Sequence, residues 1–87
     1  MTRLYARNPN VTEKRMDDAV FLAHPDTGAL YRLNVTGTAL WTLLENPVGA
    51  DDAIEVLAQA FPAQSHEQIA KDVAQVLADF EKNDLLA

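Results

Sequence analysis

The stretch that decides the fold is Leu30-Tyr31-Arg32-Leu33-Asn34-Val35-Thr36-Gly37-Thr38-Ala39-Leu40-Trp41-Thr42-Leu43-Leu44. Its first residues alternate in the manner of a strand, and from Val35 onward apolar side chains are frequent enough to give a helix a wide apolar face. Asn34 stands at the junction, where its side-chain oxygen can accept a hydrogen bond from a free N–H of the first helical turn. The stretch therefore predicts a strand that leads directly into a helix of the core.

The residues before this stretch predict two more strands. Residues 11–16 alternate moderately between apolar and polar, and Ala19–Ala23 is a short apolar run of the kind found in buried strands. The sequence His24-Pro25-Asp26-Thr27-Gly28 is a strong turn signal, because proline presets φ and glycine can take a positive φ. We therefore expect the chain to return along Ala29–Leu33 and to form a three-stranded antiparallel meander.

The remainder of the chain predicts three helices, over about 35–45, 50–61 and 65–82. Ser65 and Gln68 form a capping box that can satisfy each other's backbone N–H groups, and Asn83 can end the third helix in the left-handed conformation. The expected fold is α+β and winged-helix-like, a three-stranded antiparallel sheet followed by three helices. We expect a flexible N-terminal segment at residues 1–10 and a single domain over residues 11–87.

Composition narrows the function classes. The chain of 87 residues has no cysteine, which excludes a disulfide framework, thiol catalysis and thiolate metal sites, and fits a cytoplasmic location. No secretory signal and no membrane-spanning apolar run is found, so no membrane partner is expected. Seven basic and thirteen acidic residues give a net charge of −6, the wrong sign for binding phosphates. The predicted third helix is itself rich in acidic residues, which disfavours nucleic acid as a partner.

No catalytic or metal-binding set can be assembled from the sequence. Asp17-Asp18 and Asp51-Asp52 are adjacent pairs whose side chains diverge in a strand or a helix, so turn and helix-start roles explain them. His24 and His66 lack a metal-binding partner at the usual spacing, and Ser65, the only serine, is assigned to capping. We therefore predict a protein that is not an enzyme and has no catalytic residue, metal or cofactor.

The outer edge of the strand at residues 29–33 is what remains as a candidate binding surface. Unpaired N–H and C=O groups of an edge strand can accept an extended peptide as an added strand. If Tyr31 and Leu33 point to the core, Leu30 and Arg32 point away from it. The third helix offers a face of small residues that could form a shallow groove beside this edge: Ala70, Ala74, Leu77 and Ala78. From composition alone, close helix packing explains these alanines better than a binding groove does.

At this point the chain resembles the PqqD family, small winged-helix domains that act as precursor-peptide recognition elements in the biosynthesis of ribosomally made, modified peptides. The resemblance rests on Asp26-x-Gly28, on the stretch Tyr31-x-Leu33-Asn34-x-Thr36-Gly37-x-x-x-Trp41-x-Leu43-Leu44, and on weaker matches in the second and third helices. The chain departs from the family pattern in two places. At Pro47–Asp51 the family usually has a glycine between the first two helices and a Ser or Thr that starts the second helix. At Asn83-Asp84 the family usually has a glycine before the terminal leucines.

The resemblance implies a non-catalytic, cytoplasmic peptide chaperone. In this family the leader of a precursor peptide adds as a strand to the third strand and lies against the third helix. Carried over to this chain, the implied peptide-binding residues are Ala29, Leu30, Tyr31, Arg32 and Leu33 of the strand and Lys71, Ala74, Gln75 and Ala78 of the helix. The implied partners are a leader peptide and a modifying enzyme such as a radical SAM enzyme, a cyclase or a leader peptidase.

Three questions stay open at the level of sequence. The pathway could be pyrroloquinoline quinone (PQQ) biosynthesis, lasso peptide maturation or another peptide modified by a radical enzyme. Two alternative functions remain, a winged-helix nucleic-acid-binding regulator and a structural dimerisation module. An open strand edge also permits strand exchange, so a homodimer is not excluded.

Overall fold

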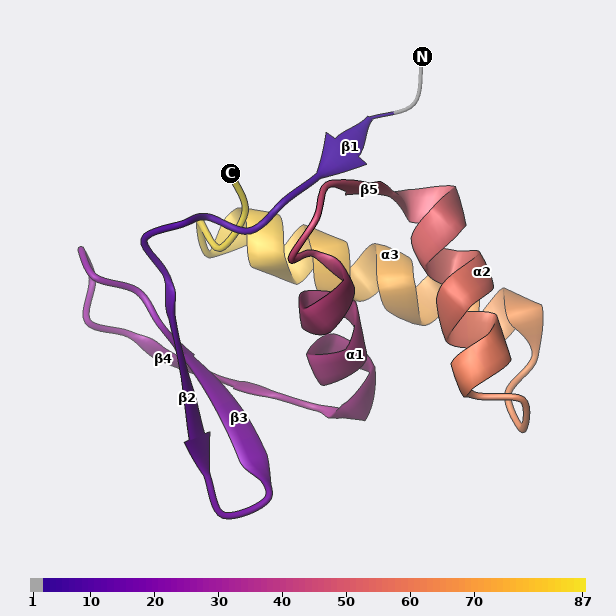
Figure 1. The fold of residues 1–87 in the computed structure, drawn as a ribbon, viewed down its shortest axis with the longest axis horizontal. Coiled ribbons are helices and arrows are strands. Elements are labelled where there is room, and N and C mark those ends of the chain that lie inside the picture. Colours follow the sequence, from indigo (N-terminus) through magenta and orange to yellow (C-terminus); the bar gives the residue numbers. More distant parts are fainter. Residues whose placement is uncertain (1–2) are drawn as a thin grey trace.

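The computed structural model describes residues 3–87 and has a main sheet followed by helices (Figure 1). Strands β2 (Thr12–Met16), β3 (Ala19–Ala23) and β4 (Leu30–Leu33) form an antiparallel sheet in the order β2-β3-β4. The helices are α1 (Val35–Leu43), α2 (Ala50–Ala60) and α3 (His66–Lys82). The predicted α+β fold, a three-stranded antiparallel sheet followed by three helices, is confirmed. A second, two-stranded sheet pairs β1 (Leu4–Tyr5) with β5 (Val48–Gly49) and was not expected.

The junction between β4 and α1 has the predicted cap. The Gly37 backbone N–H donates to Asn34 Oδ1 over 2.7 Å. A Cβ atom at Gly37 would lie 3.0 Å from that same oxygen, so a glycine allows the cap to close tightly. The first helical residue differs from the expectation, because Val35 is 71% exposed instead of contributing to the apolar face of the core.

The core lies between one face of the main sheet and the three helices. Trp41 of α1 is buried and meets Phe80 of α3 edge to face, with ring centroids 5.7 Å apart. The sheet contributes alternate residues to this core, as expected for an antiparallel sheet with one covered face. The other main contributors are apolar residues of all three helices and the C-terminal segment: Leu40, Leu44, Leu57, Ile69, Val73 and Leu85.

Two helix-terminal predictions need correction. Ser65 Oγ accepts from the Gln68 N–H, but the Gln68 side chain donates to Asp72 Oδ1 instead of returning to the cap, so only half of the capping box forms. After α3 the left-handed residue is Asp84, with φ 58°, and not Asn83. The predicted turn glycine does take a positive φ, 70° at Gly28.

The described part of the N-terminal segment contacts two other parts of the fold. Met1 and Thr2 lie outside the described residues, while β1 pairs with β5 and the Arg7 guanidinium donates to the Trp41 carbonyl. The Arg7 guanidinium also lies 4.8 Å from the centroid of the Trp41 ring. The flexibility of residues 1–10 in solution stays a prediction. Within residues 3–87, no helix combines the length and apolarity needed to cross a membrane.

Candidate functional site

The outer edge of β4 is free in the described part of the chain. β4 pairs only with β3, in a register that places Leu22 opposite Tyr31 and Phe21 opposite Arg32. The His24 N–H donates to the Ala29 carbonyl over 3.1 Å, so these two residues are a hydrogen-bonded pair of the ladder between β3 and β4. Because such pairs alternate along an antiparallel ladder, Tyr31 and Leu33 bond to β3, whereas Leu30 and Arg32 direct N–H and C=O groups outward.

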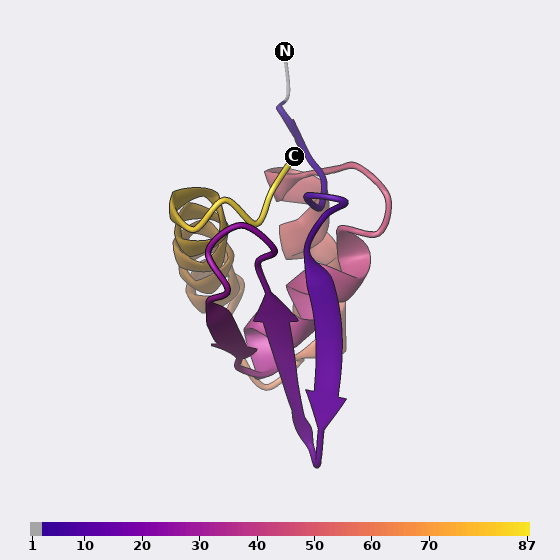
Figure 2. The same ribbon diagram turned by 90° about the vertical axis from the view of Figure 1, so that its left-hand side faces the viewer.

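The side chains of β4 alternate as the sequence predicts. Leu33 is 9% exposed and Tyr31 is half-buried against the core, while Leu30 is 54% exposed and Arg32 is exposed. Figure 2 shows β4 as the strand of the main sheet on the side where α3 lies. The free edge of β4 is therefore next to a helix and not isolated at the rim of the molecule.

A groove with a volume of about 270 Å³ lies between β4 and the C-terminal half of α3. We call it the β4–α3 groove. One wall is the strand and its continuation to Gly37, and the other wall is α3 with the segment after it. Its surface combines apolar side chains with one cation on the strand side and one anion on the helix side. The lining residues are Tyr31, Arg32, Leu33, Asn34, Gly37, Val76, Asp79, Phe80, Asn83 and Leu85.

The structure brings only part of the predicted site together. Tyr31, Arg32 and Leu33 line the β4–α3 groove, and Leu30 lies on the same edge. Ala29 is half-buried in the turn before β4, where its carbonyl bonds to His24. The four residues predicted on the helix do not line the groove and are all exposed: Lys71, Ala74, Gln75 and Ala78.

The helix side of the groove instead comes from Val76, Asp79 and Asn83. These residues are spaced by three and four positions and flank the core stripe that contains Phe80, so they share the helix face toward β4. The predicted four lie on the outward face, and only Gln75 reaches the groove indirectly, through its Nε2 atom 3.1 Å from Asp79 Oδ1. The sequence signal for the true groove face was the flank of the core stripe and not the run of alanines.

The titratable residues do not form a catalytic cluster in the described residues. His24 is buried, with Nε2 3.0 Å from Asp84 Oδ2, and the exposed His66 has its Nε2 atom 3.0 Å from Glu55 Oε1. Over residues 3–87, no group of three or more His, Cys, Asp or Glu side chains is placed to hold a metal ion. Asp51 and Asp52 lie in the first turn of α2, as predicted.

A protein-family model matches most of the chain. Residues 19–86, which include the main-sheet strands β3 and β4 and all three helices, match the family model described as coenzyme PQQ synthesis protein D (PqqD). The chain belongs to the PqqD family. The resemblance stated from the sequence is thereby confirmed, and it covers both walls of the β4–α3 groove. A comparison with curated proteins gave no match.

The fold of this PqqD-family chain is also found among solved structures. A structure described as TbiB1 in Complex with the TbiA(beta) Leader Peptide superposes with a TM-score of 0.80. The two chains are 22% identical, and the match covers 93% of each. At this identity the likeness establishes the shared fold, and the leader peptide belongs to that other protein's complex.

Proposed function

We propose that this protein is a non-catalytic adaptor that captures the leader of a ribosomally made precursor peptide and presents it to a modifying enzyme. The observation that carries the proposal is the free edge of β4, where Leu30 and Arg32 direct N–H and C=O groups outward beside the β4–α3 groove. An extended peptide would pair with these groups as a fourth strand of the main sheet. Membership of the PqqD family supports this function, as does a solved neighbour of the same fold whose printed description includes a leader peptide.

Strand addition at this edge would sort the side chains of the peptide into two sets. Successive side chains of a strand point to opposite faces, so alternate peptide residues would enter the groove. There they would meet apolar groups such as Tyr31, Val76 and Phe80, which suit aliphatic or aromatic side chains. The remaining peptide residues would lie beside Leu30 and Arg32, where a carboxylate would complement the exposed guanidinium.

The proposed contact set therefore differs on the helix from the one expected from sequence. The strand contribution is kept, with the outward backbone groups of Leu30 and Arg32 as its centre. On α3 the residues proposed to touch the peptide are Val76, Asp79, Phe80 and Asn83, because they line the groove. Lys71, Ala74, Gln75 and Ala78 face outward and are proposed to contribute little to binding.

The wider biological setting is part of the proposal. The modified peptide would follow a PQQ-like, lasso-like or other radical-enzyme pathway in the cytoplasm. The enzyme that receives it would be a radical SAM enzyme, a cyclase or a leader peptidase. The adaptor would need no cofactor, since strand pairing and groove contacts supply recognition.

The alternative of a nucleic-acid-binding regulator is less well supported. A recognition helix needs basic and amide side chains that reach phosphates and bases. Here α3 contains Glu67, Asp72, Asp79 and Glu81, and the whole chain has a net charge of −6. The other alternative, a dimerisation module, would use the same free edge of β4, so it competes directly with peptide binding.

A titration separates these functions. The small precursor gene nearest to this gene is expressed, and its labelled leader is titrated with the protein by fluorescence anisotropy, in parallel with duplex DNA at low salt. Micromolar or tighter leader binding without DNA binding supports the adaptor. Tight, salt-dependent DNA binding, or a stable dimer that excludes the leader, contradicts it. Size-exclusion chromatography with light scattering measures the dimer at the same concentrations.

A further inference from the structure

A second and larger hollow lies on the other side of β4. Its volume is about 660 Å³, and it opens between the covered face of the main sheet, the first turns of α1 and the end of α2. We call it the sheet–α1 hollow. Its lining residues come from all of these elements and from the turn between β2 and β3: Arg15, Asp18, Ala19, Val20, Arg32, Leu33, Asn34, Val35, Thr38, Ala39 and Phe61.

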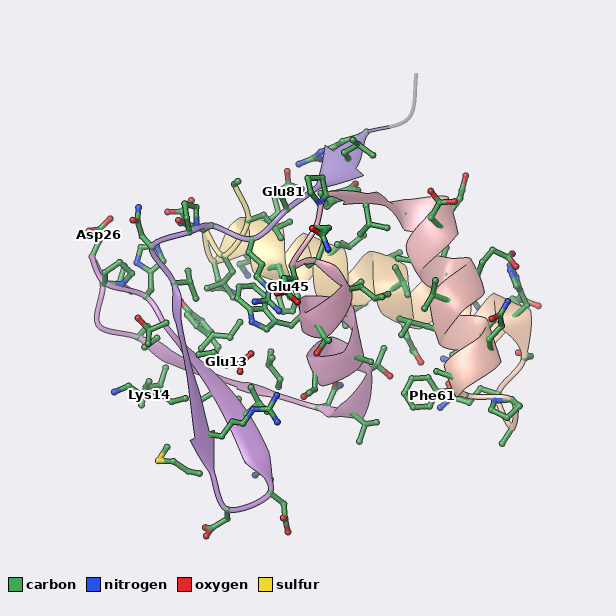
Figure 3. All side chains as sticks on the ribbon, viewed as in Figure 1. Glu13, Lys14, Asp26, Glu45, Phe61 and Glu81 are labelled. Atoms are coloured by element: carbon green, nitrogen blue, oxygen red, sulfur yellow. The ribbon has the colours of Figure 1, made fainter. Side chains whose placement is uncertain are left out.

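The hollow contains Val35, an apolar residue of the strand–helix stretch that is not part of the core. Val35 is 71% exposed, although the sequence around it packs into the core on both sides. Phe61, at the end of α2, is half-buried on the opposite wall, and Figure 3 shows its ring on the side of α2 that faces α1. The floor is formed by Val20 and Leu33, which are buried. An apolar side chain entering the hollow would therefore be surrounded by apolar surface on three sides.

Arg15 is the basic side chain on the covered face of the sheet beside this hollow. Arg15 and Asp18 line it, whereas Arg32, which also lines it, stands opposite Phe21 and so directs its side chain to the other face of the sheet. Arg15 stands opposite Val20 in the register of β2 and β3, which places its side chain on the covered face of the sheet, whereas Lys14 points to the other face. Figure 3 shows the same alternation for Glu13 and Lys14, which extend to opposite sides of β2.

Arg15 is available to a partner. Its Nε atom lies 3.3 Å from Glu13 Oε2, but 67% of the Arg15 side chain is exposed, and such exposed pairs are readily exchanged. A carboxylate that enters beside Val35 would meet Arg15 on the covered face of the sheet.

The hollow and the β4–α3 groove border the same residues at the end of β4. Both depressions are lined by Arg32, Leu33 and Asn34, so they lie on either side of the segment where β4 ends. A peptide paired with β4 that continues past Leu33 reaches the hollow directly. The main sheet is antiparallel throughout. A peptide that pairs with β4 in antiparallel orientation would therefore have its N-terminal end beside Leu33, at the end of β4.

We infer that the sheet–α1 hollow is a second subsite for the same precursor peptide, occupied by the residues that precede its paired segment. The subsite takes an aliphatic or aromatic side chain against Val35 and Phe61 and a carboxylate against Arg15. This inference rests on the proposed function, since the paired segment delivers the peptide to the hollow. It gives the adaptor a second point of selection outside the strand edge.

The test uses a display library of random peptides long enough to pair with β4 and extend beyond it, selected on the full chain. Binding of the selected peptides is then measured with two matched pairs of variants. Val35→Ser is compared with Val56→Ser, an exposed valine of α2 that lines neither depression, and Arg15→Glu is compared with Lys14→Glu, the same charge change on the opposite face of β2. Circular dichroism and thermal unfolding check that all variants are folded.

The inference predicts that Val35→Ser and Arg15→Glu each weaken binding by about tenfold, while Val56→Ser and Lys14→Glu change it by less than about twofold. Removal of residues from the N-terminal end of a selected peptide should abolish the difference within each pair. The Arg32→Pro variant lacks an outward N–H of β4. If the selected peptides fail to bind this variant but bind Val35→Ser and Arg15→Glu as tightly as the wild type, the inference is overturned and the proposed function is not. An absence of selected peptides, or peptides unaffected by Arg32→Pro, overturns the proposed function as well.

Discussion

His24 Nε2 lies 3.0 Å from Asp84 Oδ2, and this contact ties the β3–β4 turn to the segment that follows α3. The Asp26 N–H donates to His24 Nδ1 over 3.1 Å, so the ring proton is on Nε2 and is donated to the carboxylate. Asp84 holds a positive φ of 58°, between Asn83 and Leu85, which both line the β4–α3 groove. The contact therefore joins the two walls of the groove at one end.

We expect His24→Leu to lower the free energy of unfolding by about 1–2 kcal/mol. Leucine fills a similar volume, so the loss reports the two hydrogen bonds and not a cavity. Urea denaturation followed by circular dichroism measures the change. The same variant should bind the leader more weakly, because the two groove walls are no longer tied together.

Asp84→Asn is the control for that variant. Asparagine tolerates a positive φ and its amide oxygen can accept from His24 Nε2–H, so the change should stay below about 0.5 kcal/mol. Asp84→Ala removes the acceptor and strains the backbone, and should cost about as much as His24→Leu or more. Equal stability of Asp84→Ala and the wild type would show that the contact does not stabilise the fold.

Arg32→Pro should abolish leader binding while leaving the fold intact. Proline is tolerated at an edge position whose N–H points away from the sheet, and it removes one of the outward donors of β4. Glu13→Pro is the matched control, because the alternation of the ladder gives Glu13 an outward N–H on the far edge, that of β2. Anisotropy titration of both variants should separate them by more than about tenfold in Kd. Normal binding by a folded Arg32→Pro protein would rule out strand addition at β4.

Substitutions on α3 distinguish the groove face from the outward face. Val76→Gln should weaken leader binding by about tenfold, because Val76 lines the β4–α3 groove and offers apolar surface there. Ala74→Gln and Ala78→Gln place the same side chain on exposed positions outside the groove and should change Kd by less than about twofold. A strong effect at Ala74 or Ala78 with none at Val76 would restore the contact set expected from sequence.

The sequence predicted best where local chemistry decides the structure. Asn34 and the residues around it specify a strand, a cap and a helix within a few positions, and the free edge of β4 follows from the meander. The groove face of α3 depends on which flank of the helix packs beside β4, a tertiary relationship that the alanine spacing does not contain. Val35 was expected to help form a core helix face, yet it lies at the first helical turn, beyond the reach of the core.

The two short strands were missed for a related reason. β1 and β5 have two residues each, too few for any alternation to appear in the sequence. Their pairing joins positions far apart in the chain, Leu4 with Gly49 and Tyr5 with Val48. The sequence also showed no sign of the hydrogen bonds between the two ends of the chain, in which the Ala87 N–H donates to the Ala6 carbonyl and the Asn8 N–H to the Leu85 carbonyl.

The ion pair between Arg3 and Glu81 tests whether the N-terminal segment is docked in solution. Arg3 hydrogen-bonds to Glu81 at the end of α3 and lowers the pKa of that carboxyl below its usual value. A lowered pKa in the folded state means stabilisation that is present above the unfolded pKa and is lost as the pH falls through the folded pKa. The pair is fully exposed, so we expect little effect on overall stability and a clear effect on titration.

We therefore expect Arg3→Ala to raise the pKa of Glu81 toward its ordinary value, as measured by the pH dependence of its side-chain carboxyl signal in NMR. High salt should raise this pKa in the wild type and have less effect in the variant, because exposed charges are screened. The control is Arg15→Ala, which removes an arginine that is paired with Glu13 and not with Glu81. If the pKa of Glu81 is the same in the wild type and in Arg3→Ala, Arg3 is not paired with Glu81 in solution, which is the result that a flexible N-terminal segment would give.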